Sequence, residues 1–218
     1  MKKLLLTSLL LAGCGTEQSS DLDIVGGQKA PYKSWFGFTG RCGATLFHKR
    51  FAVSAQHCGT PKKVTFGFYR RGSGNGGKPK DSVQVKRVIH HPSWDLSLIE
   101  LERPTKLKPI RLHGDTYLED GARLASFGLG NTTGGGSGPE FLQGAVFFFN
   151  KKATQNARES IIRASAPGKA TCHGDSGGPL IFRGELVATN TFTVGKCQPG
   201  GLMGFTRLDI DWIRGFVK

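Results

Sequence analysis

A serine stands between glycines in residues 174–179, which read Gly-Asp-Ser-Gly-Gly-Pro. Glycines allow a tight turn that exposes a serine hydroxyl and places backbone N–H groups beside it. Ser176 would then be a nucleophile, and the N–H groups of Gly174 and Ser176 would bind an oxyanion. A Gly-x-Ser-x-Gly pattern alone fits a structural turn equally well, so further residues must decide.

A base and an acid precede this serine in the chain. His57 follows an apolar stretch and is next to Cys58, and Asp95 stands at the start of the apolar residues 96–101. A histidine can accept the proton of a serine hydroxyl, while a carboxylate holds the imidazole in the tautomer that this step needs. The three side chains together indicate nucleophilic acyl transfer. The serine, the histidine and the carboxylate must therefore meet in the fold.

The elements that would position these residues are short strands. Apolar runs alternate with glycine, proline and polar turns from Ile24 onward, which predicts an all-β fold. We expect strands over residues 47–55, 63–69, 82–89, 96–101, 121–127, 141–149, 179–182, 186–192 and 202–208. Apolar residues at helical spacing in 209–216 predict one short helix at the carboxyl end. Polar residues 113–120 separate two roughly equal sets of strands.

From Ile24 to the carboxyl end, the chain resembles the chymotrypsin or trypsin-like serine peptidase family. The motifs are Ile24-Val25-Gly26-Gly27, residues 42–58, His91-Pro92, residues 95–101, residues 172–180 and Asp211-Trp212-Ile213. The resemblance implies two six-stranded antiparallel Greek-key β-barrels, roughly 24–115 and 116–208, with a helix at 209–218. It also implies a serine endopeptidase that uses an acyl-enzyme, with His57 as base, Asp95 as its orienting acid and Ser176 as nucleophile. No cofactor or metal is expected. In particular, we expect no calcium requirement, because the family's calcium loop corresponds to residues 71–80, which hold no carboxylate.

The same resemblance implies activation by proteolysis. An activating protease would cut after Asp23, and the new ammonium group of Ile24 would pair with Asp175 and order the oxyanion site. Asp175 would thus have a structural role.

The substrate pocket can be placed from the resemblance as well. Ala170 would form its base beside Thr171 and His173, and its walls would come from Thr191, Phe192, Thr193 and the strand near Met203 and Gly204. With Gly204 in the family's glycine position the pocket is open and apolar, whereas with Met203 there it is shallow and suits small side chains. No acid stands at the base, so specificity for Lys or Arg is not expected.

Five cysteines leave one without a partner. The residues alone allow three pairings of Cys42, Cys58, Cys172 and Cys197, and the resemblance implies the pairs 42–58 and 172–197. Residues 1–13 have the basic and apolar regions of a signal peptide, and Cys14 follows small residues as in a bacterial lipoprotein signal. We expect a lipid on Cys14 and a polar tether over residues 14–23, with an ordinary secretory signal as the alternative. Either leader predicts export, with a lipid anchor on the cell envelope or release after activation.

The chain has 218 residues and a formal net charge of +14. Without residues 1–23, the 28 basic and 13 acidic groups give +15. This charge favours an anionic surface as a partner besides a protein or peptide substrate, but sequence-specific nucleic-acid recognition is not expected. A catalytically incidental, polyanion- or membrane-binding protein on the same fold is the alternative function, and an esterase is a third possibility. We expect a monomer.

Overall fold

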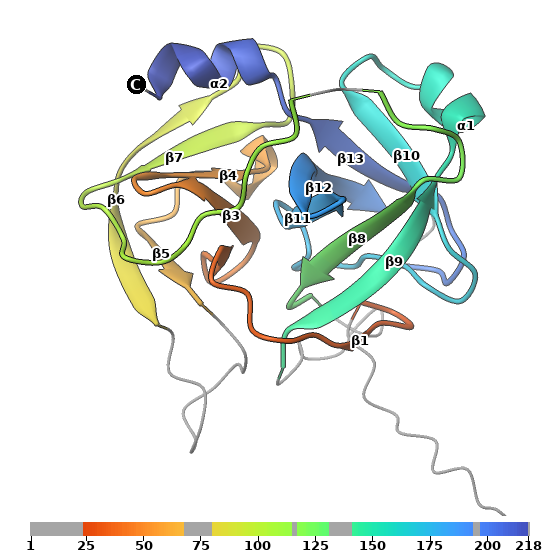
Figure 1. Ribbon diagram of the computed structural model, residues 1–218, viewed down its shortest axis with the longest axis horizontal. Coiled ribbons are helices and arrows are strands. Elements are labelled where there is room, and N and C mark those ends of the chain that lie inside the picture. The colour runs from red at the N-terminus through yellow and green to blue at the C-terminus, as the bar shows by residue number, and fades with distance from the viewer. Residues whose placement is uncertain (1–23, 68–79, 115–116, 131–140, 194–196, 218) are drawn as a thin grey trace, which may run out of the picture.

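The computed structural model describes residues 24–67, 80–114, 117–130, 141–193 and 197–217. Six antiparallel strands form a first closed barrel in the order β2-β3-β4-β7-β6-β5 (Figure 1). They are β2 (Phe36–Phe38), β3 (Gly43–His48), β4 (Phe51–Ser54), β5 (Lys63–Phe66), β6 (Asp81–His90) and β7 (Ser97–Leu101). All five residues of β7 are buried, so this strand has no solvent-facing side.

Six further antiparallel strands form the second barrel, which closes because β8 pairs with both β9 and β11. They are β8 (Arg123–Gly128), β9 (Gln143–Phe149), β10 (Ile161–Ser165), β11 (Pro179–Phe182), β12 (Glu185–Thr193) and β13 (Met203–Arg207). The short strand β1 (Gln28–Lys29) adds to β9 from outside the ring. Two barrels side by side, with mostly β structure, confirm the predicted fold (Figure 1).

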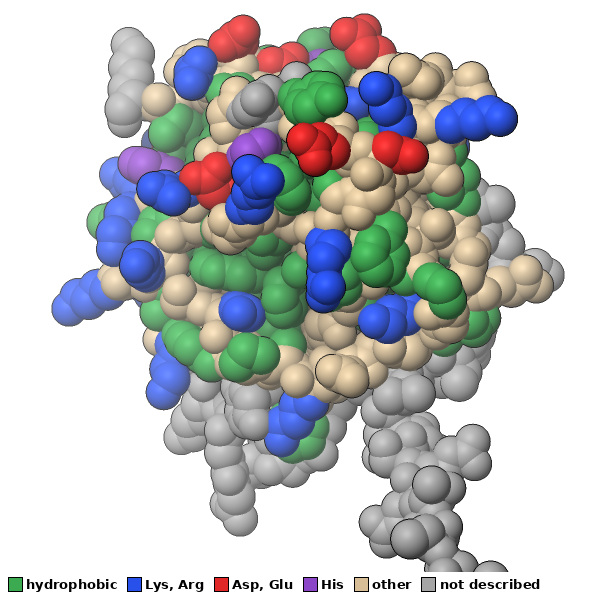
Figure 2. Space-filling view, turned by 45° about the vertical axis from the view of Figure 1, so that its right-hand side comes forward, with side chains coloured by type: hydrophobic (Ala, Val, Ile, Leu, Met, Phe, Trp, Pro, Cys, Tyr) green, Lys and Arg blue, Asp and Glu red, His purple; other side chains and the backbone are tan. Residues whose placement is uncertain are grey.

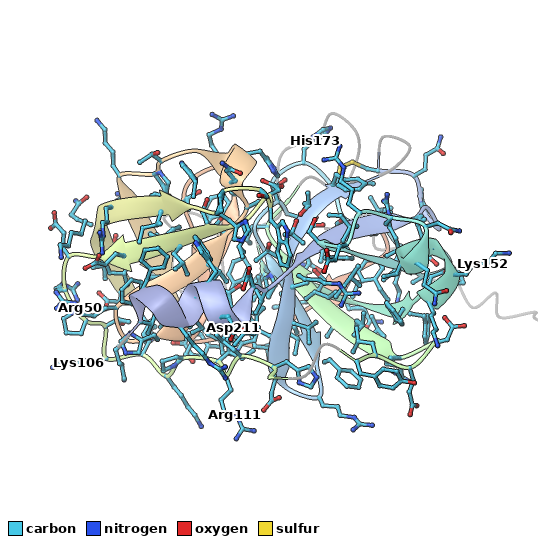
Figure 3. All side chains as sticks on the ribbon, turned by 90° about the horizontal axis from the view of Figure 1, so that it is seen from above. Arg50, Lys106, Arg111, Lys152, His173 and Asp211 are labelled. Atoms are coloured by element: carbon cyan, nitrogen blue, oxygen red, sulfur yellow. A yellow bond between two sulfur atoms is a disulfide. The ribbon has the colours of Figure 1, made fainter. Side chains whose placement is uncertain are left out.

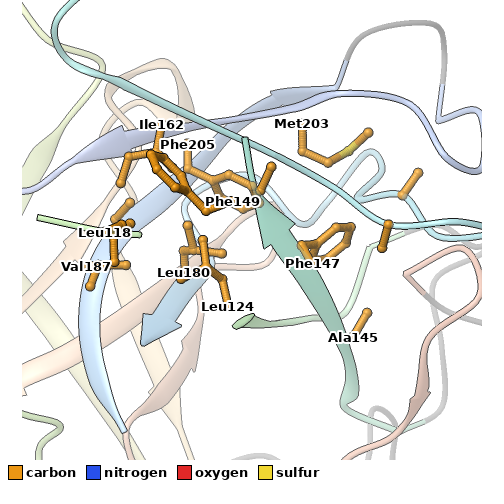
Figure 4. Packing of buried hydrophobic residues seen from close by; sticks show 14 of the residues in the cluster. Leu118, Leu124, Ala145, Phe147, Phe149, Ile162, Leu180, Val187, Met203 and Phe205 are labelled. Atoms are coloured by element: carbon orange, nitrogen blue, oxygen red, sulfur yellow. The ribbon is translucent and has the colours of Figure 1, made fainter. Parts of the chain in front are cut away.

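The core of the second barrel follows from the alternation of its strands. In β9, Ala145, Phe147 and Phe149 are buried while Phe148 between them is exposed, since successive strand residues point to opposite faces. Phe147 packs edge-on against Phe205, with ring centroids 6.2 Å apart (Figure 4). The core of the first barrel is made in the same way, by a cluster that includes Leu46, Phe66, Ile99 and Leu101.

Two α-helices and one 3₁₀ turn complete the described structure. Helix α1 (Lys151–Gln155) is capped by Asn150, and the C-terminal helix α2 (Ile210–Phe216) is capped by Asp209. The 3₁₀ turn covers Gln56–Cys58. Among the described residues, no helix is long and apolar enough to cross a membrane.

Some sequence-based element boundaries were wrong. The expected single strand 47–55 is a hairpin of β3 and β4, because the chain turns at Lys49 and Arg50 without glycine or proline to signal it. The sequence patterns also missed β1, β2, β10 and α1, which have between two and five residues each. Elements this short do not establish a period.

Candidate active site

The predicted catalytic side chains come from three separate segments. His57 lies in the 3₁₀ turn after β4, Asp95 in the loop before β7, and Ser176 in the loop before β11. His57 and Ser176 line one cavity of about 260 Å³, so a residue of the first barrel and a residue of the second face the same space. His173, which lines the same cavity, projects where the two barrels meet (Figure 3).

Two hydrogen bonds join His57 to Asp95. The Asp95 carboxylate accepts from the His57 backbone N–H at 2.8 Å, and its Oδ2 lies 2.7 Å from the imidazole Nδ1. The hydrogen bond to Asp95 raises the pKa of His57 despite partial burial, which acts in the opposite direction. Burial alone would raise the pKa of the Asp95 carboxyl, but the bonds from His57 outweigh it and hold that pKa below its ordinary value. The ring nitrogen Nε2 is thereby left to accept a proton.

The loop that carries Ser176 is held by both barrels. Gly43 of β3 donates its N–H to the Ser176 carbonyl at 2.8 Å, and Gly177 donates to the Asn190 carbonyl at 2.7 Å. A Cβ at Gly43 would lie 2.7 Å from the Cα of Gly178, so the two barrels approach here as closely as glycines allow. The position of the serine therefore depends on contacts across the barrel interface.

Backbone donors stand beside this serine. Gly174 has φ +99°, a conformation that side chains disfavour and that the glycine-rich motif permits. Within the described part of the chain, the N–H groups of Gly174 and Ser176 have no protein acceptor. Donors of this kind can stabilise negative charge that develops on a carbonyl oxygen.

Asp175 points away from this cavity, into the second barrel. Its side chain is buried and accepts from the backbone N–H groups of Gly130 and Cys172, both at 2.8 Å. A Cβ at Gly128 would come within 1.8 Å of the Asp175 Oδ1, so this strand must have glycine there. Ile24 is also fully buried in the core of this barrel.

The predicted substrate-pocket residues divide into walls and a filled base. His173, Thr191, Phe192 and Thr193 line the cavity with His57 and Ser176. The residues beneath them, which are Ala170, Thr171 and Met203, have no exposed surface.

Met203 and Gly204, the two candidates for the family's glycine position, have different strand partners. Met203 pairs with Thr193, and its Sδ lies 3.3 Å from the Thr171 hydroxyl. Gly204 pairs with Phe192 instead, and the ring of Phe192 covers the place where a Cβ would stand.

Disulfides join Cys42 to Cys58 and Cys172 to Cys197, as the resemblance implied. The sulfurs of Cys42 and Cys58 lie close to His57, but a disulfide offers no thiolate, so this cluster is not a metal site. Cys14, the leader and residues 71–79 lie outside the described residues.

Comparison with known proteins agrees with this geometry. The family model described as Trypsin matches residues 24–213. The chain belongs to the trypsin family. It is 31% identical to a trypsin of Simulium vittatum over 76% of this chain and 75% of that protein. It is 28% identical to Kallikrein-8 of Homo sapiens over 96% and 93%, and 29% identical to a trypsin of Saccharopolyspora erythraea over 73% and 78%.

As a member of the trypsin family, the protein is a serine endopeptidase, a hydrolase of protein substrates. Sequence reasoning missed three residues of this trypsin-family site. Gly130 donates to Asp175, Gly43 donates to Ser176, and Asn190 lines the cavity. Among these three, only Gly130 has a signal in the sequence, which is the pair of glycines in Gly128-Leu129-Gly130. In the structure, a side chain at either glycine would meet the buried Asp175 carboxylate.

Proposed function

We propose that Ser176, His57 and Asp95 carry out the peptidase reaction of this chain. The observation that carries the proposal is the bond between His57 Nδ1 and Asp95 Oδ2, with His57 and Ser176 on one cavity. Ser176 Oγ attacks the scissile carbonyl carbon while His57 Nε2 takes the hydroxyl proton. The N–H groups of Gly174 and Ser176 bind the oxyanion.

Collapse of this first intermediate breaks the C–N bond, and His57 returns the proton to the leaving amine. Water then attacks the acyl-enzyme and gives one proton to His57. The second collapse breaks the bond between the acyl carbon and Ser176 Oγ, His57 returns the proton to Oγ, and the carboxylic acid leaves. Asp95 remains ionised throughout, which the lowered pKa of its carboxyl favours.

The specificity that we propose is for small, uncharged side chains. Support comes from the buried Met203 and Thr171, which fill the space below the walls, and from Ala170, which brings no charge to the base. The Thr193 hydroxyl donates to the Thr171 carbonyl at 2.6 Å and narrows the same space. A Lys or Arg side chain would find neither room nor a carboxylate.

We further propose that the protein is made as a zymogen. A protease would cut before Ile24, and the new ammonium group would pair with Asp175. The burial of both residues in one barrel supports this. In this proposal, residues 24–218 form the peptidase domain.

The leader supports a proposed route out of the cytoplasm. Residues 1–13 would be a signal peptide, and 14–23 would be a tether with lipid on Cys14. Cutting before Ile24 would separate the enzyme from that lipid, so activation and release would be one event. The released enzyme would act as a monomer.

The alternative is a cationic binding protein whose turnover is incidental. Basic side chains lie at both ends of the molecule, with Arg50 and Lys106 at one end and Lys152 at the other (Figure 3). This spread favours general attraction to an anionic surface.

A fluorophosphonate distinguishes these functions, because it reacts only with a serine that an assembled base activates. The chain should be processed to begin at Ile24, exposed to the reagent and analysed by mass spectrometry. We expect one adduct, on Ser176, that is lost in His57→Ala. An unlabelled wild-type chain that is folded would support the cationic binding protein instead.

A further inference from the structure

A second cavity, of about 430 Å³, lies on the outside of the second barrel. It shares no lining residue with the cavity at Ser176. Strands β8 and β9 line it, together with residues of and after β1 and with Lys169. Its volume falls within the range of roughly 300 to 1,000 Å³ that small-molecule sites occupy.

Outward-facing side chains of β8 and β9 give this outer cavity an apolar floor. Three successive cross-strand pairs line it, which are Arg123 with Phe148, Ala125 with Val146, and Phe127 with Gly144. Phe148 is 42% exposed, although it stands in the middle of a strand. Small-molecule sites are lined mainly by apolar side chains, with a few polar groups among them. Ala125, Val146 and Phe148 form an apolar strip that follows β8 and β9, so it is long and narrow.

Three cations surround the same floor. Lys29 comes from β1, Arg123 from β8 and Lys169 from the segment after β10, and the described lining contains no Asp or Glu. The Lys29 ammonium lies 3.7 Å from the centre of the Phe141 ring, in a cation–π contact. None of the ion pairs between described residues includes Arg123 or Lys169. An anion in the outer cavity would thus meet positive charge from several segments.

The face of the molecule that includes the second barrel also combines basic and apolar side chains. In the space-filling view, basic and hydrophobic side chains share its lower half, whereas acidic side chains gather toward its upper edge (Figure 2). The electrostatic potential therefore favours an anionic ligand over a neutral or cationic one of the same shape.

We propose that this outer cavity binds a long-chain carboxylate as a single molecule. The aliphatic chain lies along the strip of Ala125, Val146 and Phe148, and the carboxylate is held by Arg123 and Lys169. A polyanion would not need the apolar floor, and an apolar peptide would not need the cations. The outer cavity is separate from the cavity at Ser176, and laurate binding to it can be measured without peptide turnover.

Calorimetric titration of the full chain with laurate, below its critical micelle concentration, tests the proposal. We expect one site, and we expect the double variant Arg123→Gln/Lys169→Gln to bind about tenfold more weakly or worse, because charge-assisted bonds are lost. Phe148→Ala should also weaken binding by removing the floor. The matched controls are Lys152→Gln/Arg158→Gln, on exposed cations elsewhere, and Phe216→Ala, on a phenylalanine exposed to 37%.

Three results would overturn this site. The first is equal binding of dodecyltrimethylammonium, because the cations should repel it. The second is competition between laurate and a peptide substrate, which would put the ligand in the cavity at Ser176. The third is binding to phosphatidylglycerol vesicles without binding of monomeric laurate, which would indicate a membrane surface. Thermal melting of each variant confirms that it is folded before titration.

Discussion

Met203 contacts Thr171, with its Sδ 3.3 Å from both the hydroxyl and the backbone nitrogen of that residue. The two residues are fully buried, and Thr193 adds a hydrogen bond to the Thr171 carbonyl. In the proposed substrate pocket, this contact would fill the base with a thioether and a methyl group instead of a charge. The proposed preference for small side chains depends on it.

The first prediction concerns a variant without the side chains of Met203 and Thr193. Met203→Gly combined with Thr193→Gly should open the pocket and shift kcat/KM toward peptides with Phe before the cleaved bond, relative to Ala, by at least about tenfold. The measurement is the ratio of kcat/KM for the two peptides. Met203→Leu keeps the volume and should leave the ratio nearly unchanged. An unchanged ratio in the double glycine variant would show that Met203 does not limit the pocket.

The pH dependence of kcat/KM should reflect the pair of His57 and Asp95. His57 must be neutral to act as a base, and its pKa is raised above the ordinary value of 6.5 by Asp95. Activity should therefore rise with pH through a midpoint above that value. In Asp95→Asn the midpoint should move down, since the carboxylate that raised the pKa is gone, and kcat should fall by about 10⁴. Asp211→Asn, at an exposed carboxylate, serves as the control. An unchanged midpoint in Asp95→Asn would show that the pH dependence does not come from a His57 whose pKa Asp95 raises.

Gly128→Ala should disrupt the buried environment of Asp175. The new Cβ would fall 1.8 Å from the carboxylate Oδ1, which cannot move without losing its bonds to Gly130 and Cys172. We expect the free energy of unfolding to fall by about 1 to 3 kcal/mol. We also expect kcat to fall by a factor that corresponds to a larger free energy, because Ser176, next to Asp175, would shift too. Denaturant unfolding and kcat measure the two effects. Gly114→Ala, where a Cβ meets nothing within 4 Å, should change neither. A fully active Gly128→Ala would contradict the proposed role of Asp175.

Asp209 joins α2 to the segment that carries Asp95. Its Oδ1 accepts from the Trp212 backbone N–H at 2.9 Å, and its Oδ2 lies 3.2 Å from Nε2 of the buried His91. His91 Nδ1 in turn accepts the backbone N–H of Trp94 at 2.9 Å. Asp209→Ala should destabilise the fold by about 0.5 to 2 kcal/mol, the usual effect of losing a helix cap.

Thermal or denaturant unfolding of Asp209→Ala measures this effect, with Asp211→Ala as the matched control. The Asp211 side chain is 94% exposed and contacts only Arg214 at 3.4 Å among the described residues. Equal stability of the two variants would show that the cap and the contact to His91 contribute nothing.

The all-β fold could be predicted because apolar runs alternate with turn residues, and the family motifs implied the two barrels. The proposed triad could be named for a similar reason, because its residues stand in local motifs. Ser176 stands in a glycine-rich turn and Asp95 at the start of a buried strand, and such features show in a single segment. Met203 could not be assigned in advance, because its place depends on the register between β12 and β13. Gly43 was missed for a related reason. Its contact with Ser176 joins two barrels, and nothing near Gly43 in the sequence indicates its partner.

The most direct test of the central claim is peptide hydrolysis by the chain processed to begin at Ile24. The substrate should have alanine before the cleaved bond, and kcat should be compared between the wild type, Ser176→Ala and the folded control Ser34→Ala. Removing the nucleophile of a triad lowers kcat by roughly 10⁶, so Ser176→Ala should be almost inactive while Ser34→Ala keeps full activity. Substantial turnover by Ser176→Ala would contradict the account, because another group would then attack the peptide bond.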